Sequence, residues 1–220
     1  MNRQTLFALL LPGVMLASPL YGQHVWFSED FSLPPADSRW HAAQGVWTYS
    51  PGSVLIATSA YDQLLASGFS LNDAEPWSAE VVLRGARAGI FFGLEDTSSR
   101  ALSHMVRFEE GSLLTGYFDA AGEFNATGAF PVPAPSAAWS TLRIDVDPLH
   151  GRYAVSVNGT LAGVDSALTF PSGHIGLQGS EGVSEFRYVR IVSAFPLRSP
   201  PPPRRGTTVR FHHVRFVRAG

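Results

Sequence analysis

The chain has 220 residues, 45% of them hydrophobic, and it contains no cysteine. This length is enough for one sizeable core and excludes a small scaffold held together by disulfides, although it does not exclude export. All 18 acidic residues lie between Glu29 and Glu185, whereas six of the 16 arginines fall after residue 195. Residues 23–195 hold nine arginines against those 18 acids, so an acidic body with a net charge of −9 precedes a basic tail.

The first 22 residues have the pattern of a secretory signal peptide. Arg3 supplies a short positive region, residues 6–17 form an apolar run, and a polar, turn-like segment follows up to Gly22. The run is too short for a comfortable membrane span, which needs about 20 apolar residues. We therefore expect cleavage after Gly22 or Ala17 and a protein that is secreted, periplasmic or on the cell surface. The alternative is an uncleaved N-terminal anchor.

From Val25 the chain becomes a series of short strand-like runs separated by turn residues, and helical periodicity is almost absent. An aromatic strand is predicted over 25–31, followed by a pair around Trp40 and 45–49. Six further strands are predicted over residues 53–57, 63–69, 78–84, 88–94, 103–109 and 113–118. The proline-rich stretch 130–135 is predicted to be irregular, because proline cannot donate to a central ladder.

The clearest strand signals lie between Thr141 and Val192. Leu142, Ile144 and Val146 alternate with charged residues, which indicates a strand with one buried and one wet face. Asn158-Gly159 separates two strand-like runs, and both residues tolerate the positive φ of a type I′ hairpin turn. About a dozen short strands without cysteine or helix predict a two-sheet antiparallel sandwich over residues 23–195.

An ordered set of motifs extends this prediction to a known family. The motifs are WFSEDFS, Trp40 followed by GVW, AGIFFGLED, WSTLRIDV, YAVSVNG, GHIGLQG and VSEFRYVRI. Over about residues 25–193 the chain resembles the concanavalin A-like, or laminin G-like, lectin/glucanase superfamily. It is most similar to bacterial exported domains of the family-16-like or 3-keto-disaccharide-hydrolase-like kind. The resemblance implies an all-β jelly-roll sandwich.

Two departures from that family's pattern speak against hydrolysis. Its best-known hydrolases carry a Glu-x-Asp-x-x-Glu strand, whose alternation places carboxylates on one face as acid and nucleophile. Here the acids form adjacent pairs, which point to opposite faces of a strand: Glu29-Asp30, Glu95-Asp96 and Glu109-Glu110. The 3-keto-disaccharide-hydrolase-like domains also show an acid in the strand after the Gly-Ile-Phe run, where this chain has His104 and Arg107.

The remaining candidate is a ligand-binding sheet face. Alternation in strands 78–84, 88–95, 103–109 and 113–119 allows one face to bury apolar residues and the other to present Arg84, Glu95, Arg107, Glu109, Tyr117 and Asp119. A tyrosine ring can stack on a pyranose while arginine and carboxylate bind hydroxyl groups. The alternative is a solvated face with cross-strand Arg–Glu pairs, each contributing about 0.2–1 kcal/mol.

Other possible ligands have weaker signals. Asp145-Val-Asp147 offers carboxylates of the kind that bind calcium, although a wet strand face explains them equally, and no other cofactor is expected. The glycines of Gly173–Gly179 resemble a phosphate loop, but no helix follows, so they indicate close strand packing or a bulge. We expect a glycan partner and no nucleic-acid partner, and the oligomeric state stays open.

The sequence thus predicts a secreted carbohydrate-binding or interaction module without catalytic activity. The alternatives are a glycan-active enzyme with loop-borne carboxylates and a structural cell-surface domain. Residues 196–220 form a proline-rich spacer and a basic tail, in which FHHVRFV repeats the earlier FRYVRIV at four of seven positions. That tail is either a duplicated strand or a mobile arm, and we expect it to be dispensable for folding.

Overall fold

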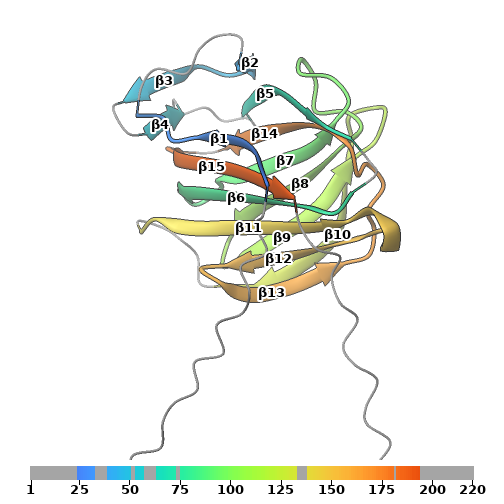
Figure 1. Cartoon of the computed structure of the whole chain (residues 1–220). Coiled ribbons are helices and arrows are strands. Elements are labelled where there is room, and N and C mark those ends of the chain that lie inside the picture. The colour runs from blue at the N-terminus through green and yellow to red at the C-terminus, as the bar shows by residue number, and fades with distance from the viewer. Residues whose placement is uncertain are drawn as a thin grey trace, which may run out of the picture.

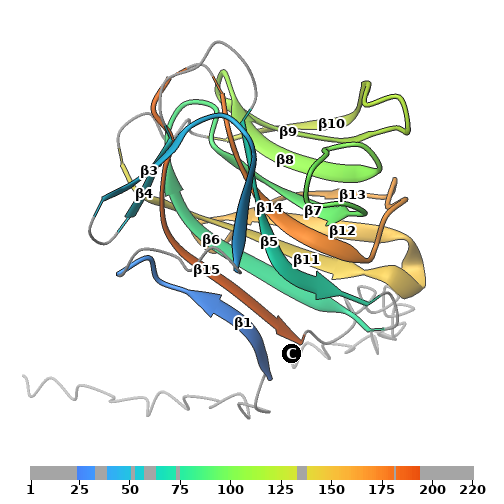
Figure 2. The ribbon, with the colours of Figure 1, turned by 90° about the horizontal axis from the view of Figure 1, so that it is seen from above.

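The computed structural model describes residues 24–32, 39–50, 53–56, 63–72, 75–132, 138–180 and 182–193. The predicted signal peptide (1–22) and basic tail (196–220) lie outside these residues. The described residues form two antiparallel sheets that pack face to face (Figures 1 and 2), and their only helical segment is the 3₁₀ turn η1, Pro148–His150. The expected all-β antiparallel sandwich is confirmed.

One sheet has eight strands, in the order β13-β12-β11-β6-β15-β4-β3, and β1 also pairs with β15. The bounds of its strands are β1 Val25–Glu29, β3 Trp47–Ser50, β4 Ser53–Ile56, β6 Trp77–Arg84, β11 Ser140–Asp147, β12 Arg152–Val157, β13 Thr160–Asp165 and β15 Glu185–Ser193. The other sheet has seven strands, in the order β10-β9-β8-β7-β14-β5-β2. Its bounds are β2 Trp40–Gln44, β5 Gln63–Leu71, β7 Gly89–Leu94, β8 Ser103–Glu109, β9 Ser112–Phe118, β10 Phe124–Pro131 and β14 Gly173–Gly179.

The predicted hairpin at Asn158-Gly159 is confirmed. Val157 pairs with Thr160, and the two turn residues have φ values of 50° and 78°, the positive pair that a type I′ turn requires. The Asn158 side chain also accepts a hydrogen bond from the backbone N–H of Thr141 at 2.9 Å. The turn therefore fixes the register of β12 with β13 and anchors it to β11 as well.

Strand β10 is the main element that the sequence did not predict. Among the described strands it pairs with β9 alone, and its last residue, Pro131, pairs with Ser112 at the edge of the seven-stranded sheet. The expectation of irregular structure from residue 130 onward is wrong for the first two of these residues. An edge strand needs hydrogen bonds on one side only, so a terminal proline is tolerated there.

Apolar side chains fill the space between the sheets and also cover part of one outer face. The inner core contains fully buried residues of both sheets, among them Trp77, Ile144 and Phe92. A second buried cluster belongs to the seven-stranded sheet alone and consists of Leu64, Ala66, Phe91, Leu94, Met105 and Phe118. Because Phe91 and Phe92 are adjacent in β7, they point to opposite faces, and this second cluster lies on the outer face.

A buried carboxylate joins the two sheets where β13 ends. Asp165 Oδ2 accepts hydrogen bonds from Thr115 Oγ1 of β9 at 2.7 Å, from Tyr153 OH of β12 at 2.9 Å and from the hydroxyl of Thr127 in β10. Burial alone would raise the pKa of Asp165, but the threonine, tyrosine and backbone donors outweigh it and the pKa lies below its usual value. Burial raises the pKa of Tyr153, and the neighbouring carboxylate raises it further. The pair is therefore a carboxylate with a neutral phenol.

This arrangement predicts a large cost for removing the carboxylate. Asp165→Ala leaves the buried hydroxyls of Thr115 and Tyr153 without their acceptor, so the free energy of unfolding should fall by at least about 2 kcal/mol. Glu110→Ala is the control, because that carboxylate is 85% exposed and its loss should cost less than about 1 kcal/mol. Urea denaturation measures both. An equal loss in the two variants would show that Asp165 does not hold the sheets together.

Candidate functional site

The six predicted ligand residues do not share one face. His104 of β8 pairs with Tyr117 of β9, whereas Arg107 pairs with Leu114. Tyr117 therefore lies on the same face as His104, toward the inner core, and Arg107 lies on the outer face. The expectation that Arg107, Glu95 and Tyr117 project from the same side of one sheet is wrong.

Three of the six residues form ion pairs away from the other three. Arg84 belongs to β6 in the eight-stranded sheet, where it pairs with Glu185, and its guanidinium carbon lies 4.8 Å from the centre of the Trp139 ring. Arg107 contacts Glu109 at 2.7 Å, near the far end of β8. Arg84 and Glu185 form a cross-strand pair, as the alternative of a solvated sheet face expects, whereas Arg107 and Glu109 lie on one strand.

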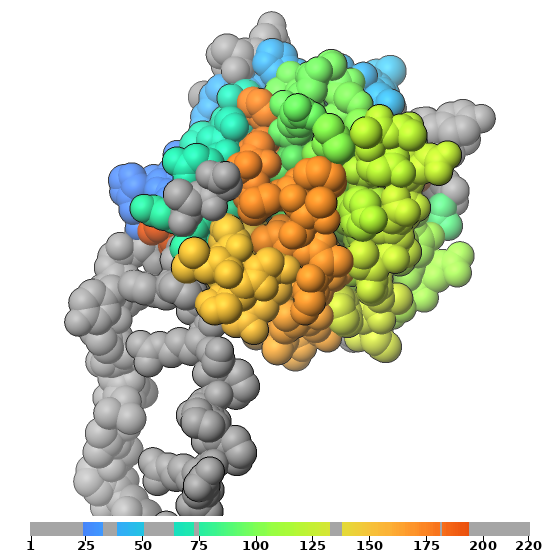
Figure 3. Space-filling view, turned by 90° about the vertical axis from the view of Figure 1, so that its right-hand side faces the viewer, coloured from blue at the N-terminus to red at the C-terminus, as the bar shows by residue number. Residues whose placement is uncertain are grey.

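Glu95, Tyr117 and Asp119 lie together at the opposite end of the sandwich, beside an open groove of about 490 Å³. The groove, which we call the Glu95 groove, is lined by the ends of β5 and β7, the residue before β8, and the connection between β13 and β14: Ser70, Leu71, Gly93, Glu95, Leu102, Thr169, Phe170, Pro171, Ser172 and Gly173. Figure 3 shows the orange surface of that connection between the teal surface of β5 and the green surface of β7 and β8.

The connection 166–172 forms one wall of the groove and packs closely on β7. A Cβ atom on Gly93 would lie 2.2 Å from the carbonyl oxygen of Phe170, and one on Gly173 would lie 2.4 Å from that of Leu94. Both glycines also have positive φ values. The Trp77 indole N–H donates to the Pro171 carbonyl at 3.1 Å. The wall is thus held to both sheets, and the groove is pre-formed.

The wall is also held by hydrogen bonds to the buried side chain of His104. Its Nε2 accepts hydrogen bonds from the backbone N–H groups of Thr169 at 2.9 Å and Phe170 at 3.1 Å. Its ring stacks on Phe92, with ring centres 4.9 Å apart. Burial lowers the pKa of His104 to about 4. Because Nε2 accepts twice, we assign the proton to Nδ1, and the ring is neutral at pH 7.

Tyr117 and Asp119 support the groove without lining it. The Tyr117 ring centre lies 6.3 Å from that of Phe170, behind the wall. Asp119 accepts hydrogen bonds from the N–H groups of Ala121 at 2.9 Å and Glu123 at 3.0 Å, and the Glu123 bond contributes most to its lowered pKa. The Asp119 carbonyl in turn accepts from Leu102. Of the six predicted residues, Glu95 alone lines the groove.

The groove offers the groups that bind a sugar. Glu95 is exposed and accepts hydrogen bonds, the hydroxyls of Ser70, Thr169 and Ser172 can donate or accept, and the half-buried Phe170 adds an aromatic residue to the lining. Sequence patterns missed the wall residues, because a connection without periodicity carries no signal of where its side chains lie.

Glu95 is the single carboxylate among the described lining residues, whereas most glycoside hydrolases use two facing carboxyl groups. Its neighbour Asp96 accepts a hydrogen bond from the N–H of Ser98 at 2.7 Å, and this bond lowers the pKa of Asp96. Asp96 is thus an ionised turn residue. The lining thus presents one carboxylate, Glu95, to a ligand in the groove.

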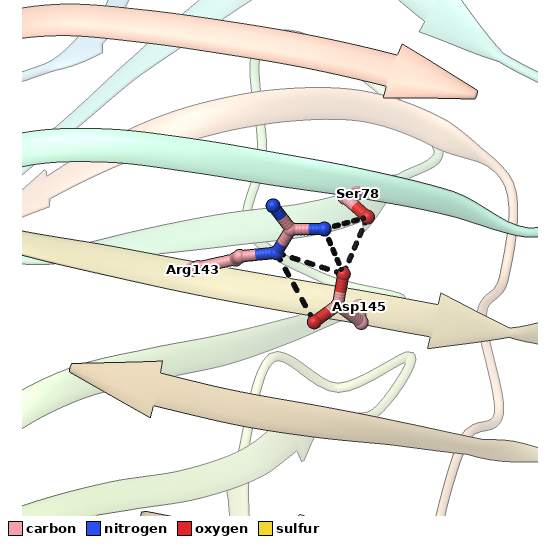
Figure 4. A network of polar contacts seen from close by, with 3 residues as sticks. All are labelled: Ser78, Arg143 and Asp145. Atoms are coloured by element: carbon pink, nitrogen blue, oxygen red, sulfur yellow. Dashed lines mark hydrogen bonds and ion pairs between the residues drawn. The ribbon is translucent and has the colours of Figure 1, made fainter. Parts of the chain in front are cut away.

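The carboxylates considered for calcium already have partners. Asp145 Oδ1 lies 2.7 Å from the Arg143 guanidinium, which also donates to Ser78 at 3.1 Å on the neighbouring strand β6 (Figure 4). Asp147 Oδ2 lies 2.7 Å from His150 Nδ1. Within the described ranges, no group of three or more histidine, cysteine, aspartate or glutamate side chains could hold a metal ion. The calcium interpretation gains no support.

Comparison with known proteins defines the fold. No family model matches the sequence, and no curated sequence is significantly similar to it. Among solved structures, the chain is similar to the carbohydrate-binding module CBM66 from Bacillus subtilis, with a TM-score of 0.61, 14% identity and coverage of 71% of this chain and 96% of that one. It is similar to the carbohydrate recognition domain of Emp46p in its metal-free form, with a TM-score of 0.58, 13% identity and coverage of 74% and 94%. It is also similar to LamAcat from Zobellia galactanivorans, with a TM-score of 0.54, 13% identity and coverage of 77% of this chain and 98% of that one.

These matches and the two-sheet topology identify the fold as the concanavalin A-like lectin/glucanase jelly roll. The likeness concerns the fold alone, because the sequence identities are low. Over the described residues there is also no helix with the length and apolar character needed to cross a membrane.

The buried His104 predicts a specific pH dependence. The imidazole stays neutral down to about pH 4 in the folded protein but titrates near its ordinary pKa of 6.5 when unfolded. Between these values the unfolded state binds more protons, so the free energy of unfolding should decrease by about 3 kcal/mol as the pH falls through this window.

The two-state unfolding free energy, measured by urea titration at intervals from pH 7.5 to about 4, tests this prediction for His104. His104→Gln keeps a carbonyl acceptor for the wall but cannot be protonated, so most of the decrease should disappear. His41→Gln removes an exposed histidine and should keep the decrease. A profile that is unchanged by His104→Gln would contradict the assignment.

Proposed function

We propose that the protein is an exported, non-catalytic carbohydrate-binding module that holds its glycan in the Glu95 groove. The observation that carries this proposal is the lining of the groove, which combines one exposed carboxylate, several hydroxyl groups and an aromatic wall in a pre-formed hollow. A sugar presents hydroxyl donors and acceptors together with an apolar ring face, and this lining is complementary to both.

The fold supports the same class of ligand. The similar structures include a carbohydrate-binding module and a carbohydrate recognition domain, so the jelly roll is a scaffold on which sugar sites occur. Export is supported by the signal-like composition of residues 1–22.

A second observation supports an alternative function, that of a glycan-active enzyme. The similar structures also include a Crh5 transglycosylase, with a TM-score of 0.56 and 16% identity, so this fold also carries enzymes. The groove lining favours binding, because an acid and a base or nucleophile require two carboxyl groups about 5 to 9.5 Å apart. Glu95 has no such counterpart among the described lining residues.

Affinity electrophoresis against a panel of soluble polysaccharides tests this function, with β-glucan, xylan, mannan, fructan and alginate as the probes. We expect retardation by at least one of them. Glu95→Gln should weaken that binding by about tenfold or more, because a hydrogen bond to a charged group is lost. Glu110→Gln, an exposed glutamate at the other end of the sandwich, should bind like the unaltered protein.

Each other outcome has a definite meaning. Release of reducing sugar from the retained polysaccharide would show that the protein is a glycan-active enzyme and not a non-catalytic binding module. The absence of retardation by every probe would reject the glycan proposal and favour a structural domain. Retardation that is unaffected by Glu95→Gln would place the glycan outside the Glu95 groove.

A further inference from the structure

A second groove adjoins the Glu95 groove at the end of β5. It has a volume of about 430 Å³ and shares Ser70 and Leu71 with its neighbour. Its other lining residues include His24, Trp26, Phe69, Asn72 and Glu75, and we call it the Trp26 groove. Each groove alone lies within the roughly 300–1,000 Å³ range of ligand pockets. The exposed Ser70 thus stands between two hollows of similar size.

Trp26 reaches this groove through a β-bulge. Val25 pairs with Val192 and Phe27 pairs with Ile191, so Trp26 is an extra residue of β1 without a partner position on β15. A bulge redirects the side chain of the strand and is common beside binding sites. The neighbouring Phe27 is buried in the core, whereas Trp26 is half-buried and lines the groove.

Two further register shifts border the same place. In the pairing of β14 with β5, His174 lies opposite Ser70 and Gly176 opposite Ala66, so residues 67–69 oppose Ile175 alone. In the pairing of β14 with β7, His174 lies opposite Leu94 and Gly176 opposite Phe91. Shifts in β1, β5 and β7 therefore surround Ser70 and Leu71. Other strand pairs also have register shifts, including β15 with β6, but these three lie beside the two grooves.

The Trp26 groove repeats the chemistry of the Glu95 groove. The indole provides a flat apolar surface, the exposed Asn72 amide can donate and accept, and the exposed Glu75 carboxylate accepts hydrogen bonds. His24 is held at the rim through its backbone, since its N–H donates to Ser193 Oγ at 3.0 Å and its carbonyl accepts from the Ser193 N–H at 2.9 Å. Each groove thus has an aromatic side chain, a carboxylate and other polar groups.

We propose that the two grooves form one cleft, which binds an internal stretch of a glycan chain with consecutive sugar units on both sides of Ser70. This inference rests on the proposed carbohydrate-binding function. A module that recognises only a terminal sugar needs one hollow, whereas two adjoining hollows with matching chemistry suit a repeating polymer. The ligand class is therefore an extended oligosaccharide or polysaccharide, with Glu95 and Trp26 in contact with different units.

Calorimetric titration with fractions of one polysaccharide tests the cleft. The probes are oligosaccharides from disaccharide to hexasaccharide, prepared by partial hydrolysis of the polysaccharide that the protein retains most strongly. We expect the affinity to rise with length until both grooves are filled and then to level off. Trp26→Ala should reduce affinity for the hexasaccharide by about tenfold, because one aromatic stacking surface is lost. It should leave the weak affinity for the disaccharide nearly unchanged if that probe occupies the Glu95 groove.

Further variants separate the cleft from effects on folding. Asn72→Ala and Glu75→Gln alter exposed residues of the Trp26 groove and should show the same dependence on ligand length. Trp139→Ala is the matched control, since this half-buried tryptophan lies by Arg84 and Arg187 at the other end of the sandwich. Equal affinity for all lengths, together with a loss in Glu95→Gln, would overturn the cleft and leave the proposed function standing. Failure of every fraction to bind would overturn both.

Discussion

The carboxylate of Asp165, buried where the edges of the two sheets approach, is the interaction on which the rest of the structure depends. One of its oxygens accepts from hydroxyl groups of both sheets, and the other accepts from the N–H of Ala167 at 2.9 Å. Ala167 belongs to the connection that becomes the groove wall. The same side chain thus joins the two sheets and holds the start of the groove wall.

From Asp165 the wall is positioned step by step. His104 accepts the N–H groups of Thr169 and Phe170, and the Trp77 indole holds the carbonyl of Pro171. These partners belong to strands of the core, so the wall of the groove is held rigidly in place. Binding to a pre-formed hollow costs less ordering of side chains and loops than binding that must first assemble its site.

The outer face of the seven-stranded sheet explains why the groove lies at an end of the sandwich. Phe91, Met105 and Phe118 occupy this face, and each is at most 2% exposed. Phe124 from β10 packs against the same cluster, and its ring would contact a Cβ atom on Gly116 at 2.6 Å. This apolar half of the face is thus closed to a polar ligand. The irregular ends of β1, β5 and β7 provide the accessible polar surface instead.

Local patterns predicted the fold, but they could not predict which residues share a face. A short stretch of sequence is enough to recognise the alternation at Leu142, Ile144 and Val146 and the turn at Asn158-Gly159. Relating Arg107 to Tyr117 requires the register across the β8–β9 hairpin. Glu109 pairs with Ser112 there, so each odd-numbered residue of β8 lies opposite an even-numbered residue of β9. This register places Tyr117 on the opposite face from Arg107. The groove wall was beyond prediction, because it depends on contacts of residues distant in sequence.

The pairing of the first and last strands has a mechanical consequence. Val25 lies opposite Val192 in an antiparallel ladder, and His24 bonds to Ser193 at its end. Tension between residues 24 and 193 would load this ladder from one end, so that its hydrogen bonds break one after another instead of sharing the force. Strand β1 would peel away first, while β15 remained held by β6. Trp26 would leave with β1, and a stretched molecule would lose one groove while it retained the other.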